Sequence, residues 1–308
     1  MNLPDKDYRV IESELIRRKP KKILLQAPEG MKTSVQEIAD RIRALGPKCI
    51  IWADPCFGAC DIPEQPAKML GCDLIVHIGH AQFMEPDEIP VLFIECRSDA
   101  DFAQVIESGI SAIAHKKIGL VATIQHLGAL SKIKDILEDN GKEVFVGKST
   151  RMKHKGQVLG CNAGAAEAVE DEVDCFLTLA SGKFHALGVA KKVQKPVFLA
   201  NLDTGKIESM DKEKLLFEKK RIMKLEKLKD AKNVGILVSS KRGQFSNTDD
   251  IEKKLEQEDK KVWVLAMDYI SPEKILGMKL DALVNTACPR IDEDLVFPVP
   301  VIDKSEIL

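Results

Sequence analysis

Three short stretches of the sequence share one pattern: Asp73-Leu-Ile-Val-His77, Asp174-Cys-Phe-Leu-Thr178 and Asp281-Ala-Leu-Val-Asn285. Each begins with an aspartate, continues through three apolar residues and ends on a polar one, as a buried strand does when it reaches a loop. The aspartates at positions 73, 174 and 281 lie 101 and 107 residues apart. A repeat of this length predicts three copies of one structural unit.

Apolar runs alternate with helix-like stretches on both sides of these three segments, which is typical of parallel α/β units. We therefore predict an α/β fold of three pseudo-repeated Rossmann-like domains, each with a mostly parallel four-stranded sheet. The domains span residues 1–108, 109–205 and 206–308. The expected strands lie near residues 22–27, 49–54, 74–77, 91–95, 118–123, 143–147, 175–179, 197–201, 234–239, 261–266, 282–285 and 296–299.

Composition excludes several classes of protein. The 308 residues are 44% hydrophobic and 31% charged, which argues against disorder and against a disulfide-stapled miniprotein. The formal net charge of -2 provides no general attraction to nucleic acid or to an anionic membrane, so we expect no direct binding to either. The first ten residues lack the apolar run of a signal peptide, and no long apolar stretch follows. We expect a cytoplasmic protein.

Three of the eight cysteines lie in loops that follow predicted strands, one in each unit. These are Cys60 in Asp54-Pro-Cys-Phe-Gly-Ala-Cys-Asp61, Cys161 in Leu159-Gly-Cys-Asn-Ala-Gly164, and Cys288 in Asn285-Thr-Ala-Cys-Pro-Arg290. Parallel sheets bind ligands at the carboxyl ends of their strands. If the three units turn these ends inward, the thiols meet. Three thiolates suit a 4Fe-4S cluster with one open iron, or a zinc ion with one open position.

The cysteine spacing by itself also fits ordinary buried or free thiols, because the sequence contains no C-x-x-C pair. Cys56 and Cys60 have the C-x3-C spacing that begins the usual radical S-adenosylmethionine motif, but Pro63 occupies the third cysteine position. The role of Cys56 is therefore left undecided. Four other cysteines lie in or beside predicted strands and are expected to be packing residues: Cys49, Cys72, Cys96 and Cys175.

Three further loops carry polar residues at strand ends, and two of these loops lie at equivalent places in their units. Gln26-Ala-Pro-Glu-Gly30 follows the first strand and either presents backbone N–H groups to a carboxylate or phosphate, or is an ordinary turn. His77-Ile-Gly-His80 and Ser181-Gly-Lys-Phe-His185 follow the third strands of the first two units, where they can bind an anion, move protons or be structural. The remaining histidines are interpreted as surface or helix residues: His115, His126 and His154.

A charged segment between Lys206 and Asp230 separates the second unit from the third. Its apolar residues roughly follow helical spacing, and Lys212–Lys229 carries eight basic and three acidic residues. Two interpretations stay open. The segment is either a solvated helix that packs one apolar stripe on the body, or a docking surface for an acidic partner.

Six motifs, taken in order, resemble one family along essentially the whole chain: Q-x-P-E-G, D-P-x-x-G-A-C-D, D-L-I-V-H-x-G-H, L-G-C, S-G-K-F-H-x-L-G and N-T-A-C-P-R-I. The family is the archaeal diphthamide-biosynthesis enzymes, the 2-(3-amino-3-carboxypropyl)histidine synthases. The resemblance implies that Cys60, Cys161 and Cys288 bind a 4Fe-4S cluster at the centre of three similar α/β domains.

The resemblance also implies a reaction. S-adenosylmethionine binds the open iron as co-substrate, and one electron cleaves its sulfur–Cγ bond, which gives methylthioadenosine. The 3-amino-3-carboxypropyl group is transferred to C2 of a histidine imidazole on translation elongation factor 2, the first step of diphthamide biosynthesis. The implied partners are this elongation factor, an electron donor and a second copy of the chain, because archaeal members are homodimers.

The matching motifs supply candidates for the other roles. His80 or His185 is expected to accept the proton that the substituted imidazole loses. The residues expected to hold S-adenosylmethionine are Gln26, Glu29, Gly30, Ser181, Gly182, Lys183, His185 and Arg290.

Two other functions compete with this one. A dehydratase similar to quinolinate synthase also places a three-cysteine cluster among three α/β domains, and a non-catalytic electron carrier is a third class. The D-P-x-x-G-A-C-D and N-T-A-C-P-R-I contexts favour the diphthamide enzyme. A carrier normally saturates every iron with protein ligands.

Overall fold

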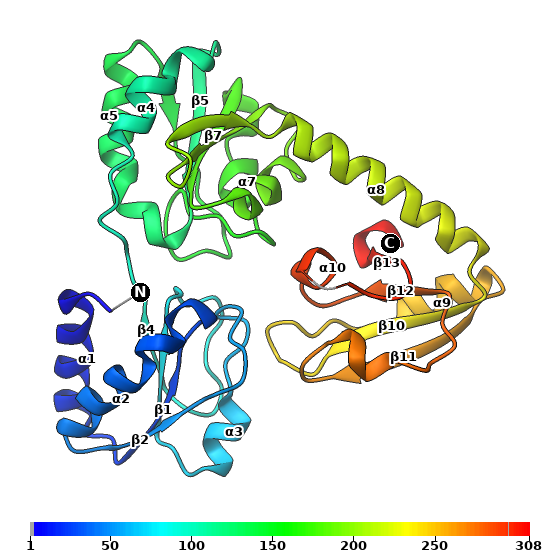
Figure 1. Cartoon of the computed structure of the whole chain (residues 1–308), viewed down its shortest axis with the longest axis horizontal. Helices are drawn as coiled ribbons and strands as arrows, with labels where there is room; N and C mark the ends of the chain where they lie inside the picture. Colours follow the sequence, from blue (N-terminus) through cyan, green and yellow to red (C-terminus); the bar gives the residue numbers. More distant parts are fainter. Residues whose placement is uncertain (1–2, 295) are drawn as a thin grey trace.

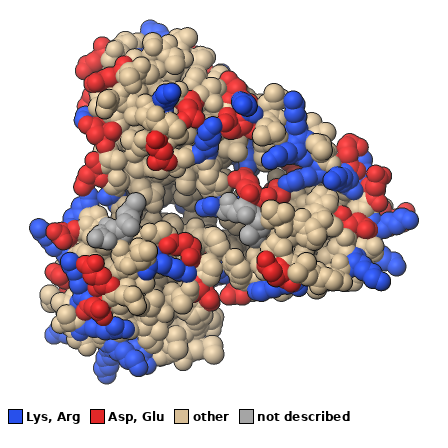
Figure 2. Space-filling view, in the orientation of Figure 1, with Lys and Arg blue, Asp and Glu red and all other residues tan. Residues whose placement is uncertain are grey.

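The chain folds into three lobes, each built around one β-sheet (Figure 1). The computed structural model describes residues 3–294 and 296–308. Three mostly parallel sheets confirm the predicted α/β class. Within the described residues, no helix combines the length and the apolar character needed to cross a membrane. Basic and acidic side chains are interspersed over the face shown in Figure 2, as the small net charge predicts.

The first and third sheets have the same topology. The first contains β1 (Lys22–Gln26), β2 (Lys48–Ile51), β3 (Leu74–Ile78) and β4 (Val91–Ile94), in the order β2-β1-β3-β4. The third contains β10 (Asn233–Ser239), β11 (Lys261–Met267), β12 (Ala282–Asn285) and β13 (Val301–Asp303), in the order β11-β10-β12-β13. All pairs in both sheets are parallel. The loops after the strands therefore gather at one edge of each sheet.

The second sheet differs by one additional strand. It contains β5 (Lys117–Ala122), β6 (Glu143–Phe145), β7 (Cys175–Ala180), β8 (Val197–Asn201) and β9 (Lys206–Ser209), in the order β6-β5-β7-β8-β9. β9 pairs antiparallel with β8, so this sheet has five strands instead of the predicted four. The predicted domain boundary at residue 205 falls inside the turn between these two strands. The charged segment was expected to be helical from its start, and it begins as a strand instead.

The repeated aspartates lie immediately before the third strand of each unit for a structural reason. The carboxylate of each accepts a hydrogen bond from a backbone N–H at the start of the neighbouring central strand. The distances from nitrogen to oxygen are 2.8 Å for Asp73, 2.9 Å for Asp174 and 2.8 Å for Asp281. These bonds lower the pKa of Asp174 and Asp281 below the usual value. The aspartates fix the amino ends of the strands, opposite the edge that carries the cysteine loops.

Burial follows from the sequence of the strands and helices. Ile23, Leu24 and Leu25 of β1 have no exposed surface, because helices and loops cover both faces of a parallel sheet. Helix α2 buries Ile38 and Ile42, one turn apart on its inner face. The helices are α1 (Asp5–Arg18), α2 (Val35–Ala44), α3 (Glu64–Met69), α4 (Ala103–Gly109), α5 (Leu130–Asp139), α6 (Gly164–Glu167), α7 (Lys183–Ala190), α8 (Asp211–Asp230), α9 (Asp249–Gln257) and α10 (Arg290–Asp294).

Helix α8 connects the second lobe to the third (Figure 1). Of its apolar side chains, Leu228 is buried and Leu225 packs against the core of the third lobe. Leu215, Leu216 and Ile222 are exposed. The expected apolar stripe therefore packs on the body only near the carboxyl end of the helix.

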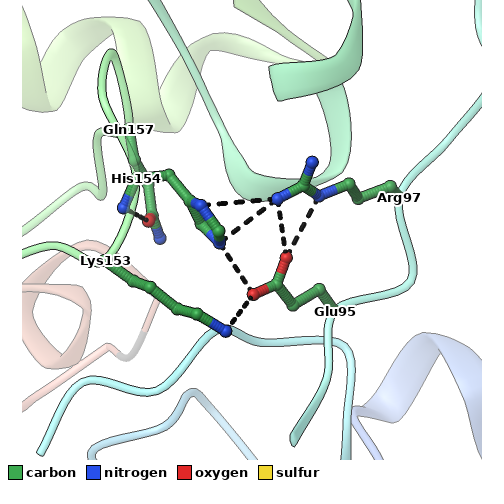
Figure 3. Close-up of polar contacts among 5 residues, drawn as sticks. All are labelled: Glu95, Arg97, Lys153, His154 and Gln157. Atoms are coloured by element: carbon green, nitrogen blue, oxygen red, sulfur yellow. Dashed lines mark hydrogen bonds and ion pairs between the residues drawn. The ribbon is translucent and has the colours of Figure 1, made fainter. Parts of the chain in front are cut away.

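An ion-pair cluster joins the first lobe to the second (Figure 3). Glu95 and Arg97 follow β4, whereas Lys153 and His154 follow β6. The Glu95 carboxylate receives His154 Nε2 at 2.7 Å and Lys153 Nζ at 3.0 Å on one oxygen, and an Arg97 nitrogen at 2.9 Å on the other. Burial alone would raise the pKa of Glu95, but the bonds from His154 and Lys153 outweigh it and lower that pKa to about 2.

We predict that this cluster stabilises the protein above pH 4.5 and weakens as acid is added. Because the pKa of Glu95 is lowered from 4.5 to about 2, its contribution is lost as the pH falls through that interval. Glu95→Gln should lower the free energy of unfolding at neutral pH by about 1 kcal/mol, allowing for solvent screening of the partners. Urea unfolding at several pH values measures this, and the gap from wild type should close near pH 2. Glu107→Gln, at an exposed position of α4, is the control. A gap that does not change with pH would contradict the prediction.

Candidate metal centre

The structure brings together the loops that carry Cys60, Cys161 and Cys288. Cys60 lies between β2 and α3, Cys161 between β6 and α6, and Cys288 between β12 and α10. Cys60 and Cys288 are half-buried, and Cys161 is exposed. Partial desolvation raises the pKa of all three thiols, to about 12 for Cys288. The charge of Cys161 further raises the pKa of Cys60, and both raise that of Cys288. Thiols that influence one another electrostatically lie near one centre, each supplied by a different lobe.

The donor set fits an iron-sulfur cluster better than a single zinc ion. A tetrahedral zinc site holds its sulfur ligands about 2.3 Å from the metal, which brings them into mutual contact. Within residues 3–294 and 296–308, the group of three donors whose ligand atoms lie within 4.8 Å of one another is Cys56, His77 and His80. That group does not contain the three cysteines from the three lobes. The sulfurs of Cys60, Cys161 and Cys288 are too far apart to bind one ion in this arrangement. Their wider separation suits a 4Fe-4S cluster, which is larger than an ion.

The third lobe supports the Cys60 loop directly. Gln244 Nε2 donates a hydrogen bond to Cys60 Sγ at 3.5 Å. Lys241 Nζ forms a buried ion pair with Asp61 Oδ1 at 2.7 Å, whereas Oδ2 of the same carboxylate has no hydrogen-bond partner within the part of the chain that the structure describes. A Cβ at Gly243 would lie 2.5 Å from the carbonyl oxygen of Cys60, so only glycine permits this approach.

These third-lobe residues were not predicted as part of the site. Lys241, Gly243 and Gln244 follow β10, the first strand of the third unit. Gln26 ends the first strand of the first unit, and His126 follows that of the second. The repeat itself was therefore the signal that would have found them, through comparison of the loop after the first strand in all three units.

The structure does not bring the Gln26–Gly30 loop to the centre as a ligand-binding turn. Gln26 is completely buried, and its side-chain amide binds the Asp61 carbonyl and His77. Glu29 and Gly30 are exposed, and Glu29 forms an ion pair with Lys32 at 2.7 Å. Gln26 is thus a buried support of the Cys60 loop, and its predicted role as a ligand of S-adenosylmethionine stays a prediction.

The Ser181–His185 loop divides into two parts. Ser181 Oγ lies 3.0 Å from His126 Nε2, and Gly182 precedes α7 with a φ of +79°. The Lys183 ammonium is held by Glu213 at 2.6 Å and Glu208 at 3.2 Å. These two carboxylates already neutralise Lys183, which argues against its predicted role in binding the substrate carboxylate.

His185 and Arg290 meet across the second and third lobes. The Arg290 guanidinium lies 4.6 Å from the centroid of the Phe184 ring, and Arg290 directly follows the Cys288-Pro pair. Burial, followed by the charges of Arg290, His126 and His80, lowers the pKa of His185 to about 4. His185 is therefore neutral at physiological pH and has several potentially cationic neighbours.

His126 also belongs to this region. It is buried in the 3-10 helix Ile124–Ala129, packs edge-on against Phe102 and contacts Ser181. His126 lies on a helix, which is one of the two expected placements, and it is buried where the fold brings the end of β5 beside the end of β7. His154 instead joins the two lobes through Glu95.

The other cysteines are distributed largely as expected. Cys49, Cys72 and Cys175 are buried among apolar side chains, which confirms their packing role. Cys96 is half-buried and packs at the edge of the first core. Cys56 is buried, and its sulfur lies within 4.8 Å of ligand nitrogens of His77 and His80.

Two adjoining cavities lie between the first and third lobes. The larger, of about 480 Å³, is lined by charged residues of both lobes, including Asp61, Glu64 and Arg242. The smaller, of about 60 Å³, is lined by Cys288, Arg290 and Phe57, among others. Lys241, Asp268 and Tyr269 line both cavities. The Phe57 and Tyr269 rings stack at 6.0 Å between centroids. A charged cavity thus leads to the cysteine centre.

Three α/β lobes that converge on three cysteines define a candidate iron-sulfur protein, and comparison with known proteins identifies which kind. Residues 27–308 match the family model described as "Putative diphthamide synthesis protein". The chain is 31% identical over 304 residues to the 2-(3-amino-3-carboxypropyl)histidine synthase of Pyrococcus horikoshii, covering 96% of this chain and 87% of the relative. It is 31% identical over 319 residues to the synthase of Methanocaldococcus jannaschii, covering 96% and 86%.

Solved structures agree. The crystal structure of Dph2 from Pyrococcus horikoshii matches with a TM-score of 0.91 and 30% sequence identity over 98% of this chain and 88% of that one. A second structure of the same protein, with a 4Fe-4S cluster, matches with a TM-score of 0.90. The chain belongs to the diphthamide synthesis protein family. Membership of this family distinguishes the chain from the quinolinate synthases, the alternative with a similar fold and the same number of cluster cysteines.

We predict that the three cysteines bind one cluster together. Changing Cys60, Cys161 or Cys288 to alanine should remove most of the iron, sulfide and visible absorbance from anaerobically purified protein, because each change removes one of three ligands. Cys49→Ala is the matched control, since Cys49 is buried in β2 and should leave the iron content unchanged. An intact cluster in the Cys161→Ala protein would contradict the three-ligand centre.

A second prediction tests the packing of the third lobe on the Cys60 loop. Gly243→Ala places a methyl group against the Cys60 backbone, so the loop must shift and cluster content should fall. Gly128→Ala is the control, because nothing lies within 4 Å of a Cβ built there. Iron and sulfide per chain measure the effect. Equal iron content in the two variants would show that this close approach is not needed.

Proposed function

We propose that this protein transfers the 3-amino-3-carboxypropyl group of S-adenosylmethionine to a histidine of translation elongation factor 2. The observation that carries the proposal is the meeting of Cys60, Cys161 and Cys288 from three lobes in a chain similar to named synthases. The names of these relatives support a transferase, and the cluster in the Pyrococcus structure supports the cofactor.

The three thiolates would hold the cluster and leave one iron without a protein ligand. When bound, a 4Fe-4S cluster supplies the electron that breaks the sulfur–Cγ bond of S-adenosylmethionine, which makes the protein a non-classical radical enzyme. Overall, one sulfur–carbon bond breaks, one carbon–carbon bond forms at imidazole C2, and the C2 proton leaves. The sulfonium becomes the thioether methylthioadenosine, so neither an oxidant nor a reductant is consumed in the balance.

The residues around the centre would orient the substrate, and orientation selects which sulfur–carbon bond breaks. Arg290, beside Cys288, is suited to bind the carboxylate of the amino-acid portion. The charged cavity shared by the first and third lobes offers room for the adenosine, and the Phe57–Tyr269 stack forms an apolar wall near it. This placement brings the sulfonium between Arg290 and the cysteines.

The proposal includes three partners: the elongation factor, an electron donor and a second copy of the chain. Modification of a translation factor fits a cytoplasmic location. Helix α8 offers a surface for protein contact, because Leu215, Leu216 and Ile222 are exposed among basic side chains. Two of its cations, Arg221 and Lys224, are already paired with carboxylates of the third lobe. A docking role of α8 would therefore depend on its other lysines.

We predict that the reduced protein incubated with S-adenosylmethionine releases methylthioadenosine. Chromatography with mass detection distinguishes this product from 5′-deoxyadenosine, which classical radical enzymes form. The Cys161→Ala protein serves as the control and should release neither. Formation of mainly 5′-deoxyadenosine would reject the bond choice. Release of no nucleoside product from protein with an intact cluster would favour an electron carrier.

A further inference from the structure

A chain of hydrogen bonds runs through the buried interior from Gln26 to His80. It starts at the backbone carbonyl of Asp61, which receives Gln26 Nε2 at 2.6 Å. A carbonyl oxygen can only accept, so the amide nitrogen of Gln26 must face Asp61. The amide oxygen of Gln26 then faces His77 Nδ1, at 2.7 Å. The orientation of the Gln26 amide is therefore fixed by the loop that carries Cys60.

This orientation determines the tautomer of His77. Because Gln26 Oε1 can only accept, His77 Nδ1 must carry a proton and donate it. His77 has no exposed surface, and burial, followed by the charge of His80, holds its pKa well below the usual value. The ring is therefore neutral at physiological pH and has a single proton. His77 Nε2 consequently carries a lone pair.

The hydrogen bond between the two histidines also determines the tautomer of His80. His80 Nδ1 lies 2.9 Å from His77 Nε2, so Nδ1 must donate. Burial lowers the pKa of His80 to about 4, although a hydrogen bond to the Ile78 carbonyl opposes the shift. In the proposed tautomer, the Nδ1 proton is shared between this carbonyl and His77 Nε2. His80 is thus neutral, with its proton on Nδ1 and a lone pair on Nε2. A neutral imidazole with one free lone pair is a proton acceptor.

His80 lies near His185 of the second lobe. Its charge contributes to the lowered pKa of His185, which also senses Arg290 and His126 from the other two lobes. The preceding residue, Gly79, receives a hydrogen bond from Gln125 of the second lobe at 3.1 Å. The groups that face the His80 ring are His77, Cys56 and the Ile78 carbonyl from the first lobe, and His185 from the second.

We propose that Gln26 and His77 are positioning residues that hold His80 in its Nδ1–H tautomer, so that Nε2 accepts the proton lost from C2 of the target imidazole. This inference rests on the function proposed above. In the step concerned, the C2–H bond of the substituted imidazole breaks and the proton moves to His80 Nε2. The unpaired electron would return to the cluster that supplied it, so the ring regains its aromaticity. The overall balance is unchanged, because the proton is the one that the transfer reaction releases.

Two substitutions at one position test the tautomer. Gln26→Leu removes the acceptor for His77 Nδ1–H, so both histidines should populate mixed tautomers. Gln26→Glu, protonated in this fully buried position, donates to the Asp61 carbonyl and accepts from His77 Nδ1, so it should preserve the wild-type tautomer. The direct measurement is nitrogen NMR of histidine-labelled holoprotein with the cluster oxidised. Wild type and Gln26→Glu should show His80 with an unprotonated Nε2. A proton on Nε2 in wild type would overturn the proposal.

The second measurement is the number of elongation-factor histidines modified for each methylthioadenosine released. General acid–base catalysis typically contributes about 10²–10⁴-fold, so loss of the tautomer in Gln26→Leu should lower this ratio by about tenfold or more. Gln26 also supports the Cys60 loop, so Gln26→Leu is compared through the ratio per methylthioadenosine released, which corrects for any loss of cluster. Gln26→Glu should retain the wild-type ratio. An unchanged ratio in Gln26→Leu protein with mixed tautomers would overturn the role of the chain. Failure of wild type to release methylthioadenosine would instead reject the proposed function and leave the NMR result standing.

A metal ion at Cys56, His77 and His80 is the alternative use of these donors. The hydrogen bond at 2.9 Å argues against it, because His77 Nε2 and His80 Nδ1 share a proton there. Metal analysis of the holoprotein decides the matter. We expect no zinc bound in proportion to the chain. One zinc per chain that disappears in Cys56→Ala would overturn the proposal.

Discussion

The close approach of three loops from three lobes is the constraint on which the rest of the structure depends. No single lobe offers more than one of the three proposed cluster ligands, so the centre exists only where the lobes hold one another in place. Gly243 admits the Cys60 backbone at a distance that a side chain would prevent, and the buried ion pair between Lys241 and Asp61 fixes the same contact. The Glu95 cluster joins the first lobe to the second. The interfaces between lobes are thus part of the site.

The residues at the amino ends of the strands and those at the carboxyl ends have different roles. At the amino ends, Asp73, Asp174 and Asp281 bind backbone N–H groups and secure the central strands. At the carboxyl ends, partly exposed thiols and histidines gather where desolvation disfavours their charged forms. Such an environment holds thiols protonated until a metal centre replaces the proton, and it holds imidazole rings ready to accept one. Because the strands are parallel, the residues that stabilise each sheet lie at one edge and the residues of the proposed site lie at the opposite edge.

The sequence predicted most of this architecture because the repeat is regular and the strands are continuously apolar. The predictions from the sequence were wrong where strand pairing decides whether a segment becomes a strand and where the strand begins. The residues from Lys206 form a strand because β8 offers its edge, and nothing in their charged sequence indicates this. The last strand was expected near residues 296–299, but it begins at Val301. Pro298 and Pro300 cannot donate to a ladder, so pairing starts after them.

The same distinction applies to the site. The loops of Cys60, Cys161 and Cys288 could be placed at strand ends from the sequence, but Lys241 and Gln244 could not, because their importance comes from a contact between lobes. Gln26 was assigned to ligand binding, and only the structure shows that its amide is buried in a hydrogen-bond chain.

The most direct test of the account is a crystal structure of the anaerobically prepared holoprotein with diffraction data collected at the iron absorption edge. The account predicts one iron-rich density bound by the sulfurs of Cys60, Cys161 and Cys288, with one iron free of protein ligands. Iron bound instead by Cys56, His77 and His80, or held by only two of the three cysteines, would contradict it.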